Sequence, residues 1–158
     1  MGLDIEVWRL YEPAKDCTAE TCESSDHVTT WRHSEFPAHF KGLTEDHYTG
    51  MRVMRFPAGS YGGYSHWRDW LSRTFLGAGS DAVFDKPENY KEKPFEELIN
   101  YSDCEGCIGP KVCMKLAQDF RTHYGAAHLA AIDQYQVILY ERFMVAFGLA
   151  ASGCVRFC

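Results

Sequence analysis

The stretch LDIEVWRLY (residues 3–11) alternates between two kinds of side chain. The alternation divides its residues between two faces: Leu3, Ile5 and Val7 on one, and Asp4, Glu6 and Trp8 on the other. A period of two is typical of a strand that buries one face. The stretch therefore predicts a strand, with the aliphatic face directed toward the core.

Two further stretches predict strands. MRVMRF (51–56) alternates as well, and strict alternation puts Arg52 on the same face as Phe56, which leaves the inward face ambiguous. CVRFC (154–158) is short and β-prone, and we expect it to close the sheet beside the first strand.

Three stretches predict helices. HWRDWLSRTFL (66–76) has apolar residues at helical spacing behind Ser65, a suitable N-cap, and PKVCMKLAQDFRTHY (110–124) opens with a first-turn proline. The stretch from 128 to 152 is apolar on most faces, so we expect one long, central helix. PFEELINY (94–101) fits a short helix or the end of a strand.

Strands near both ends and helices in the second half indicate an α+β protein. We expect a single globular domain over residues 1–158, with a small antiparallel or mixed sheet packed against two or three helices. Long polar excursions interrupt it at about 12–50 and 77–92. Excursions of this length in a compact domain are usually functional or mobile.

Composition restricts the class of partner. The formal charge of −6 argues against general nucleic-acid binding, which requires a basic face. The chain has no apolar run long enough for a membrane span and no signal-peptide pattern, so we expect a cytoplasmic protein without membrane contact. Seven cysteines without a scaffold spacing indicate reduced thiols, with Cys113 and Cys154 expected in the core.

The stretch YSDCEGCIGPKV (101–112) contains a CxxC pair, Cys104 and Cys107. Zinc requires four ligands, and no second pair with a standard spacing exists, so we expect a turn and no metal or other cofactor. A redox pair is disfavoured because Gly109 and Pro110 separate it from the next helix. Asp103 and Glu105, two acids in one tight turn, are candidates for binding ribose hydroxyls or for acid–base work, or they are solvated.

The stretch RFPAGSYGGYSHWRDW (55–70) combines glycines, aromatic rings and arginines. With an aromatic share of 15%, some rings should line a pocket for a planar, anionic ligand. The predicted ligand-binding residues are Arg55, Ser60, Tyr61, Tyr64, Trp67 and Arg68, together with Asp103 and Glu105. The alternative is that Trp67 and Trp70 belong to the core and that the arginines form a solvated face.

Four segments together resemble a group of small uncharacterised proteins of phages and bacteria: MGLDIEVW, AGSYGGYSHWR, LINYSDCEG-IGP and VRFC. Asp103, Glu105 and Gly106 match the pattern of that group, whereas the position of Cys107 is not regularly cysteine in it. The group has no assigned activity, so no catalytic residue carries over. The resemblance implies a phage setting, in which small proteins often counter host defence.

Three functions follow as hypotheses. The first is a non-enzymatic binder of a small nucleotide-derived ligand, such as a sequestered immune signal. The second is an enzyme of hydrolase type acting on such a ligand through Asp103 or Glu105, assisted by His66. The third is an inhibitor or adaptor that binds a host protein. Exposed aromatic residues would also favour a homodimer.

Overall fold

β1 (Gly2–Pro13) lies at the centre of a five-stranded antiparallel sheet with the order β2-β3-β1-β5-β4. The computed structural model describes residues 2–14, 26–101 and 105–158. On either side of β1 lie β3 (His47–Ser60) and β5 (Gly153–Phe157). Ile5 is therefore paired with Phe56 on one side and with Phe157 on the other. The three predicted strands, and the place of the last beside the first, are confirmed.

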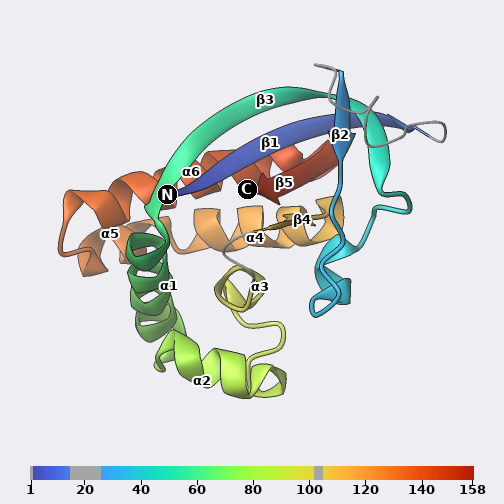
Figure 1. Ribbon diagram of the computed structural model, residues 1–158. Coiled ribbons are helices and arrows are strands. Elements are labelled where there is room, and N and C mark those ends of the chain that lie inside the picture. Colours follow the sequence, from blue (N-terminus) through green and yellow to red (C-terminus); the bar gives the residue numbers. More distant parts are fainter. Residues whose placement is uncertain (1, 15–25, 102–104) are drawn as a thin grey trace.

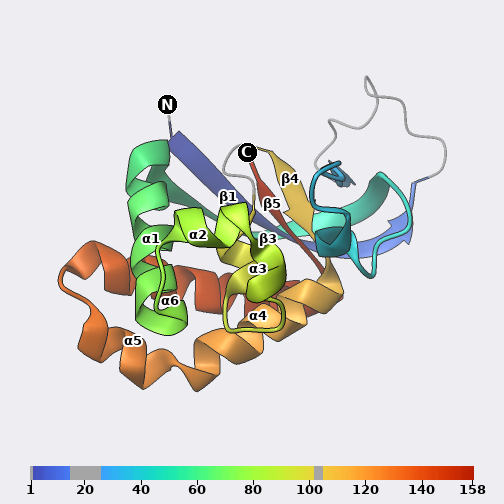
Figure 2. The same ribbon diagram turned by 90° about the horizontal axis from the view of Figure 1, so that it is seen from below.

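The sheet arches over the helices that cover its concave face (Figure 1). The long α-helices that contact it are α1 (Tyr61–Leu76), α4 (Pro110–Thr122) and α6 (Gln134–Leu149). The remaining elements are β2 (His27–Thr29), η1 (Pro37–Phe40), α2 (Ser80–Asp85), η2 (Pro87–Asn89), α3 (Glu96–Ile99), β4 (Gly106–Ile108), α5 (Tyr124–Ala130) and η3 (Ala150–Ser152). Seen from below, α2 and α3 lie beside α1 and α4 (Figure 2). The predicted single α+β domain is confirmed, with more helices than expected.

Aromatic rings fill the space between sheet and helices. Phe143 of α6 stacks on Trp67 of α1 with ring centroids 5.2 Å apart, and it meets Phe56 of β3 edge-on at 5.4 Å. Phe120 of α4 packs against Tyr140 of α6 at 4.7 Å. Most of the aromatic excess is therefore used to pack the core, where such pairs add to the stabilisation from burial alone.

A second, smaller cluster covers part of the opposite face of the sheet. The segment from residue 27 to residue 48 contributes Val28, Phe40 and Tyr48, which pack against Trp8, Cys107 and Cys154. This part of the excursion at 12–50 is therefore a structural cover. Cys154 and Cys113 are buried as predicted, and the described cysteines are free thiols.

The buried carboxylate of Glu6 lies on this second face. It accepts hydrogen bonds from Arg52 (2.6 Å) and from the Trp8 indole (3.0 Å), and Arg156 lies 3.8 Å away. Arg52 reaches this face because a bulge leaves Val53 without a partner between the pairs Val7–Met54 and Trp8–Arg52. The sequence prediction that Arg52 shares a face with Phe56 is therefore wrong.

Two predicted helix boundaries are corrected. α1 begins at Tyr61, since the hydroxyl of Ser60, and not of Ser65, accepts the N–H of Gly63 at 3.1 Å. The long helix expected over 128–152 is divided into α5 and α6, because Asp133 caps a new helix by accepting the N–H of Gln136 at 2.8 Å.

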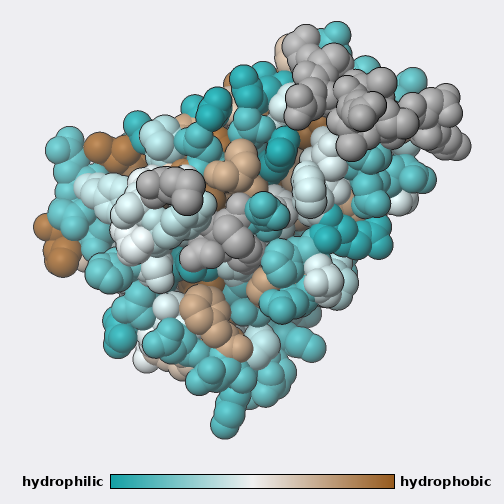
Figure 3. Space-filling model, in the orientation of Figure 1, coloured by the Kyte–Doolittle hydropathy of each residue, from teal (hydrophilic) through white to brown (hydrophobic). Residues whose placement is uncertain are grey.

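The division of the last helix exposes apolar side chains at one end of the molecule. Leu129 and Ile132, near the junction of α5 and α6, are 91% and 87% exposed. Hydrophobic atoms are visible at this end in an otherwise mostly hydrophilic view (Figure 3). Within the described ranges, none of the helices combines the length and apolar content needed to cross a bilayer.

A substitution at Gly153 tests whether β5 approaches β1 as closely as described. A Cβ at this position would overlap the backbone carbonyl of Trp8, so we expect Gly153→Ala to lower the free energy of unfolding by about 2–3 kcal/mol. Gly62, in the first turn of α1, has no atom within 4 Å of an added Cβ. Gly62→Ala should therefore raise stability by about 0.5 kcal/mol. Urea denaturation of both variants measures the difference, and equal effects would contradict the described strand contact.

Candidate functional site

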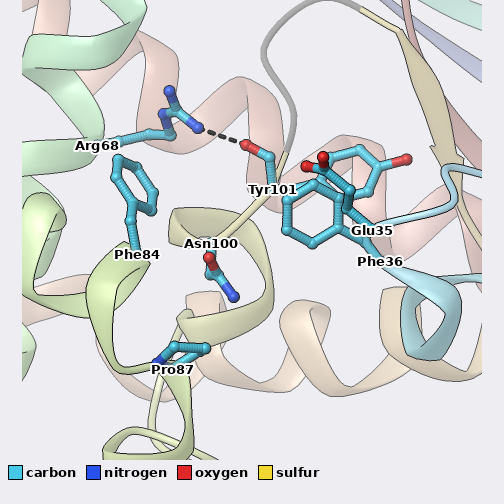
Figure 4. Close-up of a pocket in the computed structure, with 7 residues that line it drawn as sticks. All are labelled: Glu35, Phe36, Arg68, Phe84, Pro87, Asn100 and Tyr101. Carbon is cyan, nitrogen blue, oxygen red and sulfur yellow. Dashed lines mark hydrogen bonds between the residues drawn. The ribbon is translucent and has the colours of Figure 1, made fainter.

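A cavity of about 470 Å³ opens between the segment before η1, helix α1 and the segments that flank α3. Figure 4 shows Glu35 and Phe36 on one side, Arg68 and Phe84 on the other, and Asn100 between them. Among the described residues, the lining is formed by Glu35, Phe36, Arg68, Phe84, Pro87, Asn100 and Tyr101. Segments distant in the sequence thus form one concave surface.

Arg68 fixes one wall of the cavity. Its side chain is buried, and Nη1 donates to the carbonyl oxygens of Tyr101 (2.5 Å) and Ile99 (3.5 Å). The guanidinium also lies over the rings of Tyr64 (4.8 Å) and Phe84 (5.4 Å). These contacts join α1 to the chain that follows α3 and hold Phe84 at the rim.

The opposite wall is a cluster of rings. Phe36 lies 5.4 Å from Tyr101, and His39 stacks on Tyr101 at 5.0 Å. His39 Nε2 donates to the Glu97 carbonyl at 2.7 Å, while burial lowers the pKa of His39 and favours the neutral imidazole. Burial likewise raises the pKa of the Tyr101 hydroxyl, which keeps this phenol protonated.

Gly106 makes room for Tyr101. It has a φ of +131°, and a Cβ there would overlap the Tyr101 hydroxyl. The backbone at Gly106 is therefore one that glycine adopts readily and that other residues rarely adopt. The stretch continues as β4, and Pro110 opens α4 as expected.

Lys115 anchors the segment that carries Asn100. Its ammonium contacts Glu97 (2.6 Å), Asp119 (2.8 Å) and the carbonyl of Lys93 (2.6 Å). Asp119 in turn accepts the N–H of Phe95 at 2.9 Å. Phe95 is buried with a positive φ of 62°, an unfavourable conformation that these contacts on both sides hold in place.

The Tyr101 hydroxyl is buried and has no hydrogen-bond partner in the described part of the chain, and two polar side chains of the lining that reach the surface also lack one. Within the described residues, neither the Glu35 carboxylate nor the Asn100 side-chain amide makes a hydrogen bond or an ion pair. By contrast, the guanidinium of Arg68 is committed to backbone carbonyls. The groups available to a ligand are therefore one carboxylate, one amide and the faces of the aromatic rings.

The structure separates the residues of the predicted aromatic site. Tyr64 and Trp67 are 0% and 1% exposed in the core, so the prediction that they stack on a ligand is wrong, and the core alternative holds for Trp67. Tyr61 is half-buried against the same core. Ser60 caps α1. Only Arg68 lines the cavity.

The remaining candidates lie elsewhere. Arg55 is exposed and pairs with Asp4 at 2.5 Å, His66 is exposed on α1, and Glu105 is exposed just before β4.

Asp103 and Cys104 lie outside the described residues, so the cysteine pair is not tested. Cys107 is buried, and its hydrogen bond to Cys154, together with burial, raises the pKa of Cys154. Over the described ranges, no group of three or more His, Cys, Asp or Glu side chains is placed to hold a metal ion.

Sequence reasoning missed most of the lining. Glu35 and Phe36 lie in the first polar excursion, and Phe84 and Pro87 in the second. The only available signal was the length of these excursions, which suggested function without indicating particular residues.

No protein-family model, curated protein or solved structure matches this chain. The resemblance to the phage and bacterial group therefore stays a prediction. The chemistry of the cavity itself is therefore what indicates a function.

Glu96, the first residue of α3, supplies a test of this region. Burial, reinforced by neighbouring Glu97, raises the pKa of Glu96 to about 7. An acid whose pKa is higher in the folded protein stabilises it fully below the unfolded pKa, and the contribution is lost as the pH rises through 7. His39 acts in the opposite sense, because its lowered pKa removes stability as the pH falls below about 6.5.

We therefore predict that Glu96→Gln, which is neutral at every pH, becomes more stable relative to the wild type between pH 5 and 8. The expected gain is about 1–3 kcal/mol. Urea denaturation at several pH values, with Glu88→Gln as an exposed control, measures it. A difference between Glu96→Gln and wild type that does not change with pH would refute the raised pKa.

Proposed function

We propose that this protein binds a small nucleotide-derived ligand in the cavity and does not turn it over. The observation that carries the proposal is the pair of aromatic rings, Phe36 and Phe84, on opposite sides of a cavity that also presents unpaired polar groups. Rings of this kind bind planar heterocycles by stacking, and the polar groups orient them.

The size of the cavity supports a ligand of this class. Small-molecule sites typically enclose about 300–1,000 Å³, and this cavity encloses about 470 Å³. Phe84 is 39% exposed although it is a large apolar side chain, and a stacked base would cover it. The guanidinium of Arg68 lies on the Phe84 ring and holds it in place.

Binding is favoured over turnover by the residues that line the cavity. Glu35 is the one carboxylate among the described lining residues, and no histidine, serine or cysteine accompanies it. Hydrolysis by general acid–base catalysis normally needs a second positioned group. The hydrolase alternative relied on Asp103 and Glu105, and Glu105 is not part of the lining. In a phage setting, such a binder would sequester a host nucleotide signal.

Phe84→Ala tests the proposal. Loss of one stacking surface should weaken binding by about 1–3 kcal/mol, which corresponds to about 5- to 150-fold in dissociation constant. A thermal-shift screen of mononucleotides, cyclic dinucleotides and ADP-ribose would find the ligand, and calorimetric titration would compare the two proteins. Stability should change by about 1 kcal/mol or less, since the ring is at the rim.

Met114→Ala is the matched control, because Met114 is exposed on α4 and is not part of the cavity lining. It should bind the ligand as the wild type does. If no compound of the panel bound the wild-type protein, or if Phe84→Ala bound as tightly as the wild type, the proposal would be wrong.

A further inference from the structure

We infer that the base held in the cavity is guanine, with its edge read by the carboxylate of Glu35. This inference rests on the proposed function and specifies its ligand. Its starting point is the pair of unpaired polar groups, Glu35 and Asn100, that line the same cavity as the two rings.

The position of Glu35 follows from that of Phe36. The two residues are adjacent in the chain, and the carboxylate lies beside the Phe36 ring in the close-up view (Figure 4). A base that stacks between the rings of Phe36 and Phe84 turns its two faces to these rings and its edge to the groups around them. Glu35 and Asn100 are therefore placed to meet the edge of the base, whereas the rings meet its faces.

The chemistry of a carboxylate selects among bases. An ionised carboxylate only accepts hydrogen bonds, and its two oxygens match two neighbouring donors. Guanine presents such a pair, N1–H and the N2 amino group, on its Watson–Crick edge. Adenine presents a donor beside an acceptor on that edge, and hypoxanthine lacks the amino group. Guanine is thus the purine whose edge fits Glu35.

Asn100 complements this pattern. Its side-chain amide can donate to an acceptor such as O6 or N7 of guanine while Glu35 accepts from N1–H and N2. No described residue competes for either side chain. Glu35 is exposed and Asn100 is half-buried, so water replaces part of what an analogue without the matching donor loses, and we expect a discrimination of about tenfold.

A carboxylate can also accept hydrogen bonds from ribose hydroxyls, and the test must separate the two roles. We would titrate the wild-type protein with guanosine, inosine, adenosine and 2′-deoxyguanosine 5′-monophosphates and with the corresponding cyclic dinucleotides. Their phosphates are matched within each series, so differences report the base or the 2′-hydroxyl. We expect the guanosine and 2′-deoxyguanosine compounds to bind alike and at least about tenfold more tightly than the others.

Glu35→Gln should abolish this preference. The glutamine amide replaces one of the two acceptor oxygens with a donor, whereas N1–H and the N2 amino group of guanine each need an acceptor. Glu12→Gln, which changes an exposed acid near the end of β1 that is not part of the cavity lining, should retain it. Melting curves confirm that both variants fold.

The possible outcomes distinguish the guanine assignment from the proposed nucleotide binding on which it rests. Equal affinity for adenine and guanine compounds would overturn the guanine assignment and leave nucleotide binding intact. A loss of affinity confined to the 2′-deoxy compound would assign Glu35 to the ribose and also overturn the inference. If no compound of either series bound, the proposed function would fail together with it.

Discussion

Both faces of the molecule depend on how β1 is paired. Because β3 and β5 flank it, its odd-numbered aliphatic residues are buried under the helices, while Glu6 and Trp8 are directed to the opposite face. The helices pack on the face of the sheet that carries Phe56 and Phe157, and these two rings belong to the aromatic core. A one-residue slip of β1 would exchange the two faces and bury Glu6 among these rings, so the bulge at Val53 and the close contact at Gly153 maintain the register.

The position of the cavity depends on how the helices are joined to one another. Arg68 reaches from α1 to the carbonyls of Ile99 and Tyr101, and Lys115 reaches from α4 to Glu97 of α3. These contacts hold the chain around α3 between two helices. Hydrogen bonds and ion pairs of this kind are directional. They therefore define one position for this segment, where apolar packing alone would allow several positions.

Local pattern predicted the elements better than the site. The strands around Ile5 and Phe157 and the helix that opens at Pro110 follow from period, composition and the chemistry of proline. The separation of α5 from α6 was not predicted, because the N-cap residue Asp133 lies within a mostly apolar stretch that suggests one continuous helix. Of the predicted ligand-binding residues that the structure describes, only Arg68 lines the cavity, since the same glycines, rings and arginines that suit a pocket also suit a capped helix facing a core.

The sequence by itself determined the fold class, the three principal strands and the identity of much of the core, because these depend on side chains that repeat at a regular spacing. Only the tertiary structure decided which aromatic rings are exposed and which polar groups converge. Glu35, Phe84 and Asn100 are separated by many residues and share no spacing, so their proximity arises from the packing of α2 and α3 against α1 and from the cover that crosses the sheet. A cavity is a relation between distant segments, and no local pattern of residues records it.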